Sequence, residues 1–122
     1  MLIAFSVAPS GAPSDPHDTD RAERPDGSVH DAVAAAVAVV RSSGLPHRTT
    51  SMFTELEGEW DEVFAVVKAA TEAVLPFGSR VSLVLKADIR PGYTGEIDGK
   101  IARLESAVES IQHTAPEGDE HR

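Results

Sequence analysis

The segment that most constrains the fold runs from Arg80 to Arg90, where apolar residues alternate with mostly polar ones. Successive side chains of a β-strand point to opposite faces, so this pattern predicts a strand with one apolar and one polar face. Such a strand is typical of a sheet that is covered on one side and open on the other. The apolar set comprises Val81, Leu83, Leu85, Ala87 and Ile89, and the other set comprises Ser82, Val84, Lys86, Asp88 and Arg90.

The first half of the chain predicts a strand and a helix. Residues 2–8 are apolar and end at Pro9, which indicates a strand with at least one buried face. Apolar residues then recur with helical spacing over residues 29–40. Gly44 suits the left-handed conformation in which many helices end, and Pro46 cannot continue a helix.

The second half predicts a hairpin and two helices around the strand at 80–90. Residues 47–58 are long enough for two short strands joined by a tight turn near Ser51–Phe53. Residues 59–75 have helical spacing, and the acidic residues of their first turn suit the positive end of the helix dipole. A last helix is expected over residues 97–111. The expected buried stripe of the helix at 59–75 comprises Trp60, Val63, Phe64, Val67, Thr71 and Val74. The apolar stripe of the last helix comprises Ile97, Ile101, Leu104, Val108 and Ile111, and we expect it to pack on its own domain or on a partner subunit.

The order of elements is strand, helix, two strands, helix, strand and an added helix. Because crossovers between parallel strands of one sheet are right-handed, this order predicts an α+β fold, the ferredoxin-like β-α-β-β-α-β sandwich with an added C-terminal helix. The first strand then lies between the third and the fourth. We expect one domain over residues 1–113, with a long polar loop at 11–27 and a disordered acidic tail at 114–122.

Composition narrows the possible functions. The chain has no cysteine, which excludes a thiolate nucleophile and a cysteine-based zinc site, and its five histidines lack metal-ligand spacing. A net charge of −9 with scattered basic residues argues against nucleic acid as a partner. No apolar run approaches the roughly 20 residues of a membrane span. The N-terminus lacks the positive segment of a signal peptide, so we expect a cytoplasmic protein.

The open face of the predicted sheet carries acidic residues that need an explanation. Glu55 and Glu57 are expected on this face because Leu56 between them belongs to the core. Ser6 is expected between these acids and Asp88 of the far strand. The face is too polar for a second buried layer and too apolar for full solvation, which favours a second subunit with a polar ligand pocket near the contact. An ordinary solvated face with weak ion pairs is the alternative.

Four motifs distinguish this chain from a generic alternation of residues. They are Phe5-Ser6-Val7-x-Pro9-x-Gly11, Ser43-Gly44-Leu45, Thr50-x-Met52-x-Thr54-x-x-Glu57-Gly58-Glu59-Trp60-Asp61-Glu62-Val63 and Lys86-x-Asp88-x-Arg90. In these motifs the chain resembles the thiamine-binding proteins of ferredoxin-like fold. The resemblance extends along nearly the whole chain and is most specific between residues 43 and 90.

The resemblance implies a cytoplasmic homodimer or homotetramer that binds thiamine or its hydroxymethylpyrimidine half, with no catalysis and no further cofactor. Hydroxyl and carboxylate groups suit the amine and ring nitrogens of a pyrimidine, and an acidic site suits the thiazolium cation. Thioether and aromatic side chains suit the faces of the rings. The ligand-binding positions that follow from this resemblance are Ser6, Thr50, Met52, Phe53, Thr54, Glu57 and Asp88.

One departure from the family pattern bears on the ligand. The family usually has Pro-Met-Gly where this chain has Ser51-Met52-Phe53. The larger side chain of Phe53 either fills part of the pocket or adds a wall on which a ring can stack.

Two other classes of function stay open at this point. The chain is a structural or regulatory subunit if its open face binds another protein. It is a small enzyme if Asp88 and Lys86 act in acid–base chemistry. No motif in the sequence demands catalysis, and no catalytic or metal-ligating residue is predicted.

Overall fold

The computed structural model describes residues 1–13 and 29–114. Most of the loop predicted at 11–27, and the predicted tail apart from Thr114, lie outside the described residues. The elements are β1 (Leu2–Ser10), α1 (His30–Ser42), β2 (His47–Thr49), β3 (Thr54–Glu57), α2 (Trp60–Val74), a short 3-10 helix η2 (Leu75–Phe77), β4 (Arg80–Asp88) and α3 (Glu96–Thr114).

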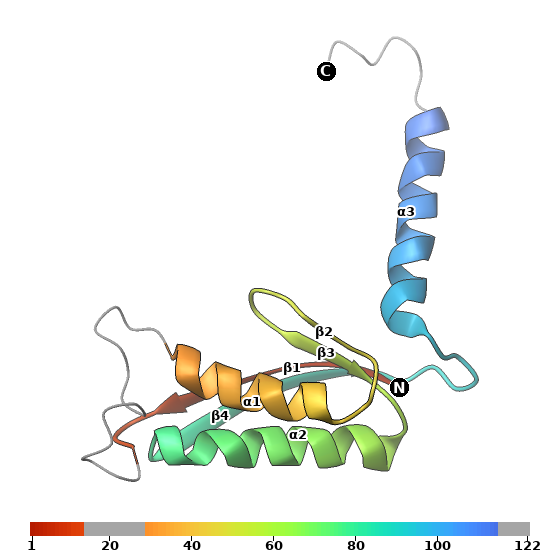
Figure 1. Ribbon diagram of the computed structural model, residues 1–122. Helices are drawn as coiled ribbons and strands as arrows, with labels where there is room; N and C mark the ends of the chain where they lie inside the picture. Colours follow the sequence, from red (N-terminus) through yellow and green to blue (C-terminus); the bar gives the residue numbers. More distant parts are fainter. Residues whose placement is uncertain (14–28, 115–122) are drawn as a thin grey trace, which may run out of the picture.

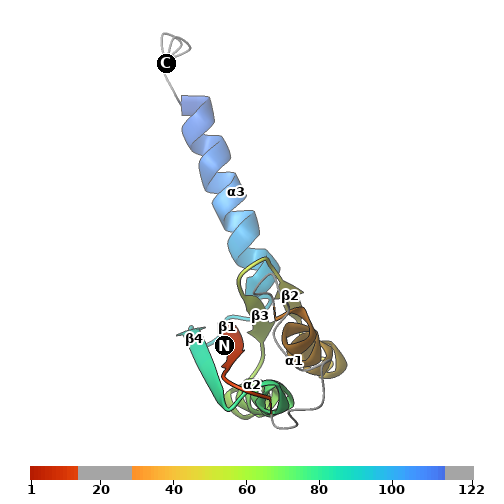
Figure 2. The ribbon, with the colours of Figure 1, turned by 90° about the vertical axis from the view of Figure 1, so that its left-hand side faces the viewer.

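The four strands form one antiparallel sheet in the order β2-β3-β1-β4. Helices α1 and α2 cover one face, and α3 rises on the opposite side (Figures 1 and 2). The predicted ferredoxin-like α+β fold with an added C-terminal helix is therefore confirmed. The hairpin expected over residues 47–58 is also present, with β2 paired to β3.

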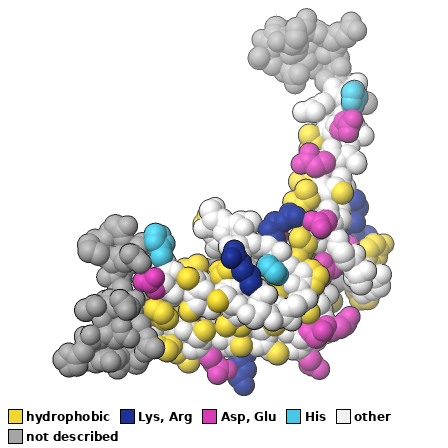
Figure 3. Space-filling view, in the orientation of Figure 1, with side chains coloured by type: hydrophobic (Ala, Val, Ile, Leu, Met, Phe, Trp, Pro, Cys, Tyr) yellow, Lys and Arg dark blue, Asp and Glu magenta, His cyan; other side chains and the backbone are white. Residues whose placement is uncertain are grey.

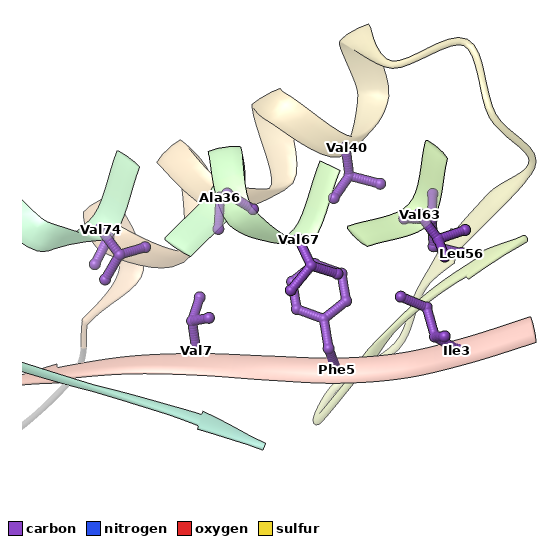
Figure 4. Packing of buried hydrophobic residues seen from close by; sticks show 11 residues of the cluster. Ile3, Phe5, Val7, Ala36, Val40, Leu56, Val63, Val67 and Val74 are labelled. Carbon is purple, nitrogen blue, oxygen red and sulfur yellow. The ribbon is translucent and has the colours of Figure 1, made fainter. Parts of the chain in front are cut away.

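The core lies between the sheet and the two crossover helices (Figure 4). Alternate residues of β1 point toward the helices, as the period of a strand requires. Small side chains on α1 allow that helix to lie close to the sheet. The buried apolar residues of this layer are Ile3, Phe5, Val7, Ala32, Ala36, Val40, Leu56, Val63, Val67, Ala70 and Val74.

Two aromatic residues predicted to be buried in α2 are exposed. Trp60 is 54% exposed and Phe64 is 37% exposed, and their rings stack on each other with centroids 5.4 Å apart. Trp60 occupies the first position of α2, and Phe64 lies beside the buried row that continues through Ala70. The apolar stripe of the sequence is thus wider than the row that contacts the sheet, which is where this prediction was wrong.

Helix α3 leaves the domain instead of packing along it (Figure 1). Within α3, Glu96 and Ile97 are buried, whereas the apolar residues of the following turns are exposed. We refer to Ile101, Leu104 and Val108 as the α3 stripe; their exposed fractions are 45%, 58% and 39%. Hydrophobic side chains are visible along this helix in Figure 3. Among the described helices, none is long and apolar enough to cross a lipid bilayer.

Candidate functional site

The register of the sheet decides which predicted residues meet on the open face. Leu2 of β1 lies between Glu57 on β3 and Asp88 on β4. Leu56 is fully buried, so its neighbour Glu57 faces the open side as expected. Ser6 does not lie between the acids and Asp88, because its partner on β4 is Val84 and β3 has already ended.

Glu57 anchors helix α3. Its side chain is buried, and its two carboxylate oxygens accept hydrogen bonds from the backbone N–H groups of Glu96 at 2.9 Å and Ile97 at 3.2 Å. The first N–H groups of a helix have no partner within the helix, and the helix dipole favours a negative charge there. Glu57 therefore satisfies the start of α3, which accounts for its burial without a ligand.

Ion pairs reinforce the attachment of α3. Lys100 pairs with Asp88 on β4, and the Arg48 Nη2 atom lies 2.7 Å from the Asp98 Oδ1 atom. The hydrogen bond from Lys100, followed by its charge and those of Lys86 and Arg90, holds the pKa of Asp88 below the ordinary value of 3.8. We refer to Glu57, Asp88 and Arg48 together as the α3 base.

The α3 base predicts a specific response to acid. A lowered pKa in the folded state means that the Asp88 contribution to stability is present above the ordinary pKa and is lost as the pH falls through the lowered value. We expect the difference in unfolding free energy between wild type and Asp88→Asn to stay constant near neutral pH and to shrink below about pH 5. Urea unfolding across that range measures it. A difference that grows on acidification contradicts this assignment.

A second set of predicted residues gathers at the other part of β1. Beyond Phe5, β1 pairs only with β4, so a space opens on its other side beneath α1 and the turn between β2 and β3. The resulting pocket has a volume of about 100 Å³. We call it the hairpin pocket; residues used below that line it are Ser6, Val37, Thr50, Met52, Phe53 and Thr54.

The turn that closes the hairpin pocket is fixed by Thr50. Its backbone N–H donates to the Phe53 carbonyl at 2.9 Å, and its hydroxyl donates to the same oxygen at 2.9 Å. The Phe53 N–H donates back to that hydroxyl at 3.3 Å. Thr side chains often stabilise turns in this way. Thr50 thus shapes the pocket, and the tight turn expected near Ser51–Phe53 is confirmed.

Thr54 and Ser6 supply hydroxyl groups with unused hydrogen-bonding capacity. Thr54 is only 8% exposed and lines the hairpin pocket, and its hydroxyl has no hydrogen-bond partner in residues 1–13 and 29–114. The half-buried Ser6 hydroxyl also has none within that part of the chain. Buried polar groups are almost always hydrogen-bonded, so an unpaired hydroxyl on a pocket wall indicates a missing partner.

The predicted ligand residues therefore separate into two places. Ser6, Thr50, Met52, Phe53 and Thr54 come together in the hairpin pocket, whereas Glu57 and Asp88 belong to the α3 base. Sequence reasoning missed the wall that α1 provides, which includes Val37. The one signal for this wall in the sequence is the alanine run at 34–36, whose small side chains allow a helix to approach a sheet closely. In the described residues, no three acidic or histidine side chains are grouped to hold a metal ion.

Comparisons with known proteins agree with this fold. The family model described as "Thiamine-binding protein" matches residues 21–105. A UPF0045 protein from Mycobacterium bovis is 43% identical over 106 residues, which cover 86% of this chain and 91% of that protein. A domain of unknown function from Bacillus cereus superimposes with a TM-score of 0.64 at 32% identity, covering 82% of this chain and 85% of that one. A hypothetical protein from Methanocaldococcus jannascii superimposes with a TM-score of 0.68 at 28% identity, covering 85% of this chain and 94% of that one.

Proposed function

The chain belongs to the thiamine-binding protein family, and we propose that its hairpin pocket binds the hydroxymethylpyrimidine half of thiamine without catalysing a reaction. The observation that carries this proposal is the unpaired, nearly buried hydroxyl of Thr54. A pyrimidine with an amine, ring nitrogens and a hydroxymethyl group offers both donors and acceptors to such a hydroxyl.

The size of the hairpin pocket supports the pyrimidine half over the whole vitamin. Its volume of about 100 Å³ is well below the roughly 300–1,000 Å³ of pockets for drug-sized ligands. One small ring is therefore the expected occupant. In bound thiamine, the thiazolium ring would stay outside the pocket and in contact with water.

The walls of the pocket suit a flat ring. Phe53 lines the pocket while its backbone is tied to Thr50, so its ring is placed as a wall. Met52 is 75% exposed at the same turn, and a thioether adapts readily to the edge of an aromatic ligand. The departure from the family pattern at Phe53 thus adds apolar contact area in this proposal.

A single substitution separates a binding hydroxyl from a structural one. Thr54→Val keeps the shape of the side chain and removes an unpaired buried hydroxyl, which costs about 1–3 kcal/mol when left unsatisfied. We expect the variant to be as stable as wild type or more stable, and to bind hydroxymethylpyrimidine about tenfold more weakly. Thermal unfolding and calorimetric titration measure the two effects.

Thr71→Val is the matched control for that experiment. The Thr71 hydroxyl donates to the Val67 carbonyl within α2 at 2.7 Å, and Thr71 is not among the residues that line the pocket. This variant should bind the ligand as wild type does. Unchanged affinity in Thr54→Val would count against the proposed site, whatever the stability shows.

The geometry at Asp88 favours binding over acid–base catalysis. Asp88 is paired with Lys100, and this pairing lowers the pKa of its carboxyl group. A general acid or base works best when its pKa lies near the working pH. The carboxylate is also on the α3 base, away from the hairpin pocket.

We also propose that the protein is a homo-oligomer in which the α3 stripe contacts a second copy. In proteins most of the stability of an amphipathic helix comes from packing of its apolar face, and α3 leaves its domain with that face exposed. Val84 of β4 pairs with Ser6 on the open face of the sheet and is 56% exposed. Helix α3 rises on this side of the sheet (Figure 2). A second copy would bury these side chains, as expected for exposed apolar patches on soluble proteins.

A further inference from the structure

A larger pocket lies where the chain passes from β4 to α3. It has a volume of about 340 Å³, which falls within the range of small-molecule pockets. We call it the turn pocket; its lining includes Glu59, Trp60, Ile89, Arg90 and Tyr93. It shares no lining residue with the hairpin pocket, so what it binds does not depend on the function proposed above.

A tight turn preorganises one wall of the turn pocket. The Tyr93 N–H donates to the Arg90 carbonyl at 3.1 Å, which closes a four-residue turn. Pro91 in its second position and Gly92 in its third, with a φ of 83°, are typical of a type II turn. The turn brings the Arg90 guanidinium over the Tyr93 ring, at 3.6 Å from the ring centroid. Both side chains are therefore held in place before any ligand binds.

An exposed tryptophan forms another part of the lining. Trp60 is backed by its stack with Phe64 and remains 54% exposed, and Ile89 nearby is 50% exposed. Tyr93 adds a further ring that is 46% exposed. Trp60, Ile89 and Tyr93 line the same pocket, and an apolar patch rimmed by polar residues is typical of a ligand-binding groove, whereas a single exposed apolar residue is not.

Arg90 is a cation in the lining of this pocket that remains available to a ligand. Within the described part of the chain, its guanidinium N–H groups have no protein acceptor. Of the neighbouring acids, Glu59 forms a capping box with Glu62 at the start of α2, in which the Glu59 N–H donates to the Glu62 carboxylate, and Asp88 pairs with Lys100. A guanidinium recognises a carboxylate or a phosphate with two parallel hydrogen bonds.

From these observations we propose that the turn pocket binds a planar aromatic ligand that carries an anionic group. The ring packs against Trp60, and the phosphate or carboxylate accepts hydrogen bonds from Arg90. Trp60 is the only tryptophan of the chain, so its fluorescence reports directly on this pocket.

The test is a fluorescence titration of the full chain with four probes. Phenyl phosphate and benzoate carry both a ring and an anion, whereas benzyl alcohol and inorganic phosphate each carry one of the two features. We expect saturable quenching of Trp60 by both ring anions, with a dissociation constant about tenfold lower than for benzyl alcohol. Equal affinity for ring anions and benzyl alcohol would overturn the proposal, as would the absence of saturation.

Arg90→Gln isolates the role of the guanidinium. This variant should bind phenyl phosphate no better than benzyl alcohol, while Arg80→Gln, at the other end of β4, should behave as wild type. Hydroxymethylpyrimidine, which has no anion, should not displace phenyl phosphate. If Trp60 in the wild-type protein is already shielded from iodide by a second copy, the surface is a protein interface and the proposal fails.

Discussion

Replacing Glu57 with alanine is expected to release helix α3 from the sheet and to lower the free energy of unfolding by about 2 kcal/mol. The carboxylate accepts from the first two N–H groups of α3, and its removal leaves those donors without a partner. Urea unfolding measures the stability. Trypsin cleavage after Arg103, which should accelerate, reports on the release of α3.

Glu55→Ala is the control for that experiment. Glu55 lies two residues away on the same face of β3, and no hydrogen bond or ion pair holds its side chain in the described residues. The Glu55→Ala variant should be cleaved by trypsin after Arg103 at the wild-type rate. The Glu57→Ala variant should still bind ligand in the hairpin pocket. If it loses ligand binding while α3 stays protected from trypsin, then Glu57 is a ligand residue, as the sequence suggested, and its assignment to the α3 base is wrong.

Leu104→Glu is expected to convert the oligomer into monomers. Leu104 lies in the middle of the α3 stripe and is 58% exposed in a single chain. A charge at the centre of an apolar contact costs roughly 2 kcal/mol or more, which raises the dissociation constant of the oligomer by about 30-fold. Sedimentation over a concentration series measures that shift.

The opposite face of α3 offers a matched control. Ser106→Glu introduces the same charge two residues along, on the side away from the α3 stripe. It should sediment as wild type does. A wild-type protein that is monomeric at micromolar concentration would contradict the oligomer itself, and equal behaviour of the two variants would contradict the contact through Leu104.

The fold could be predicted from the sequence because the patterns that determine it lie within single helices and strands. The alternation from Arg80 to Arg90 and the helical stripes each lie within one element, and right-handed crossovers leave few ways to connect them. The burial of Leu56 likewise followed from strand period alone. The pattern within one helix does not show where the core ends, and for this reason Trp60 was wrongly predicted to be buried.

The candidate site could be predicted only in part, because its residues depend on contacts between distant segments. Thr50 and Thr54 were found through a motif within one hairpin. The role of Glu57 depends on a helix that begins 39 residues later, and no spacing rule connects the two. The neighbours of Ser6 depend on the register between β1 and β3, because β3 pairs with β1 only as far as Phe5.

Recognition of the pyrimidine half of thiamine by the hairpin pocket can be measured by calorimetric titration of the wild-type protein with hydroxymethylpyrimidine and with thiamine. We expect one site per chain for each ligand and similar affinities for the two, because the thiazolium ring stays outside a pocket of about 100 Å³. No heat with either ligand at millimolar concentration would contradict it.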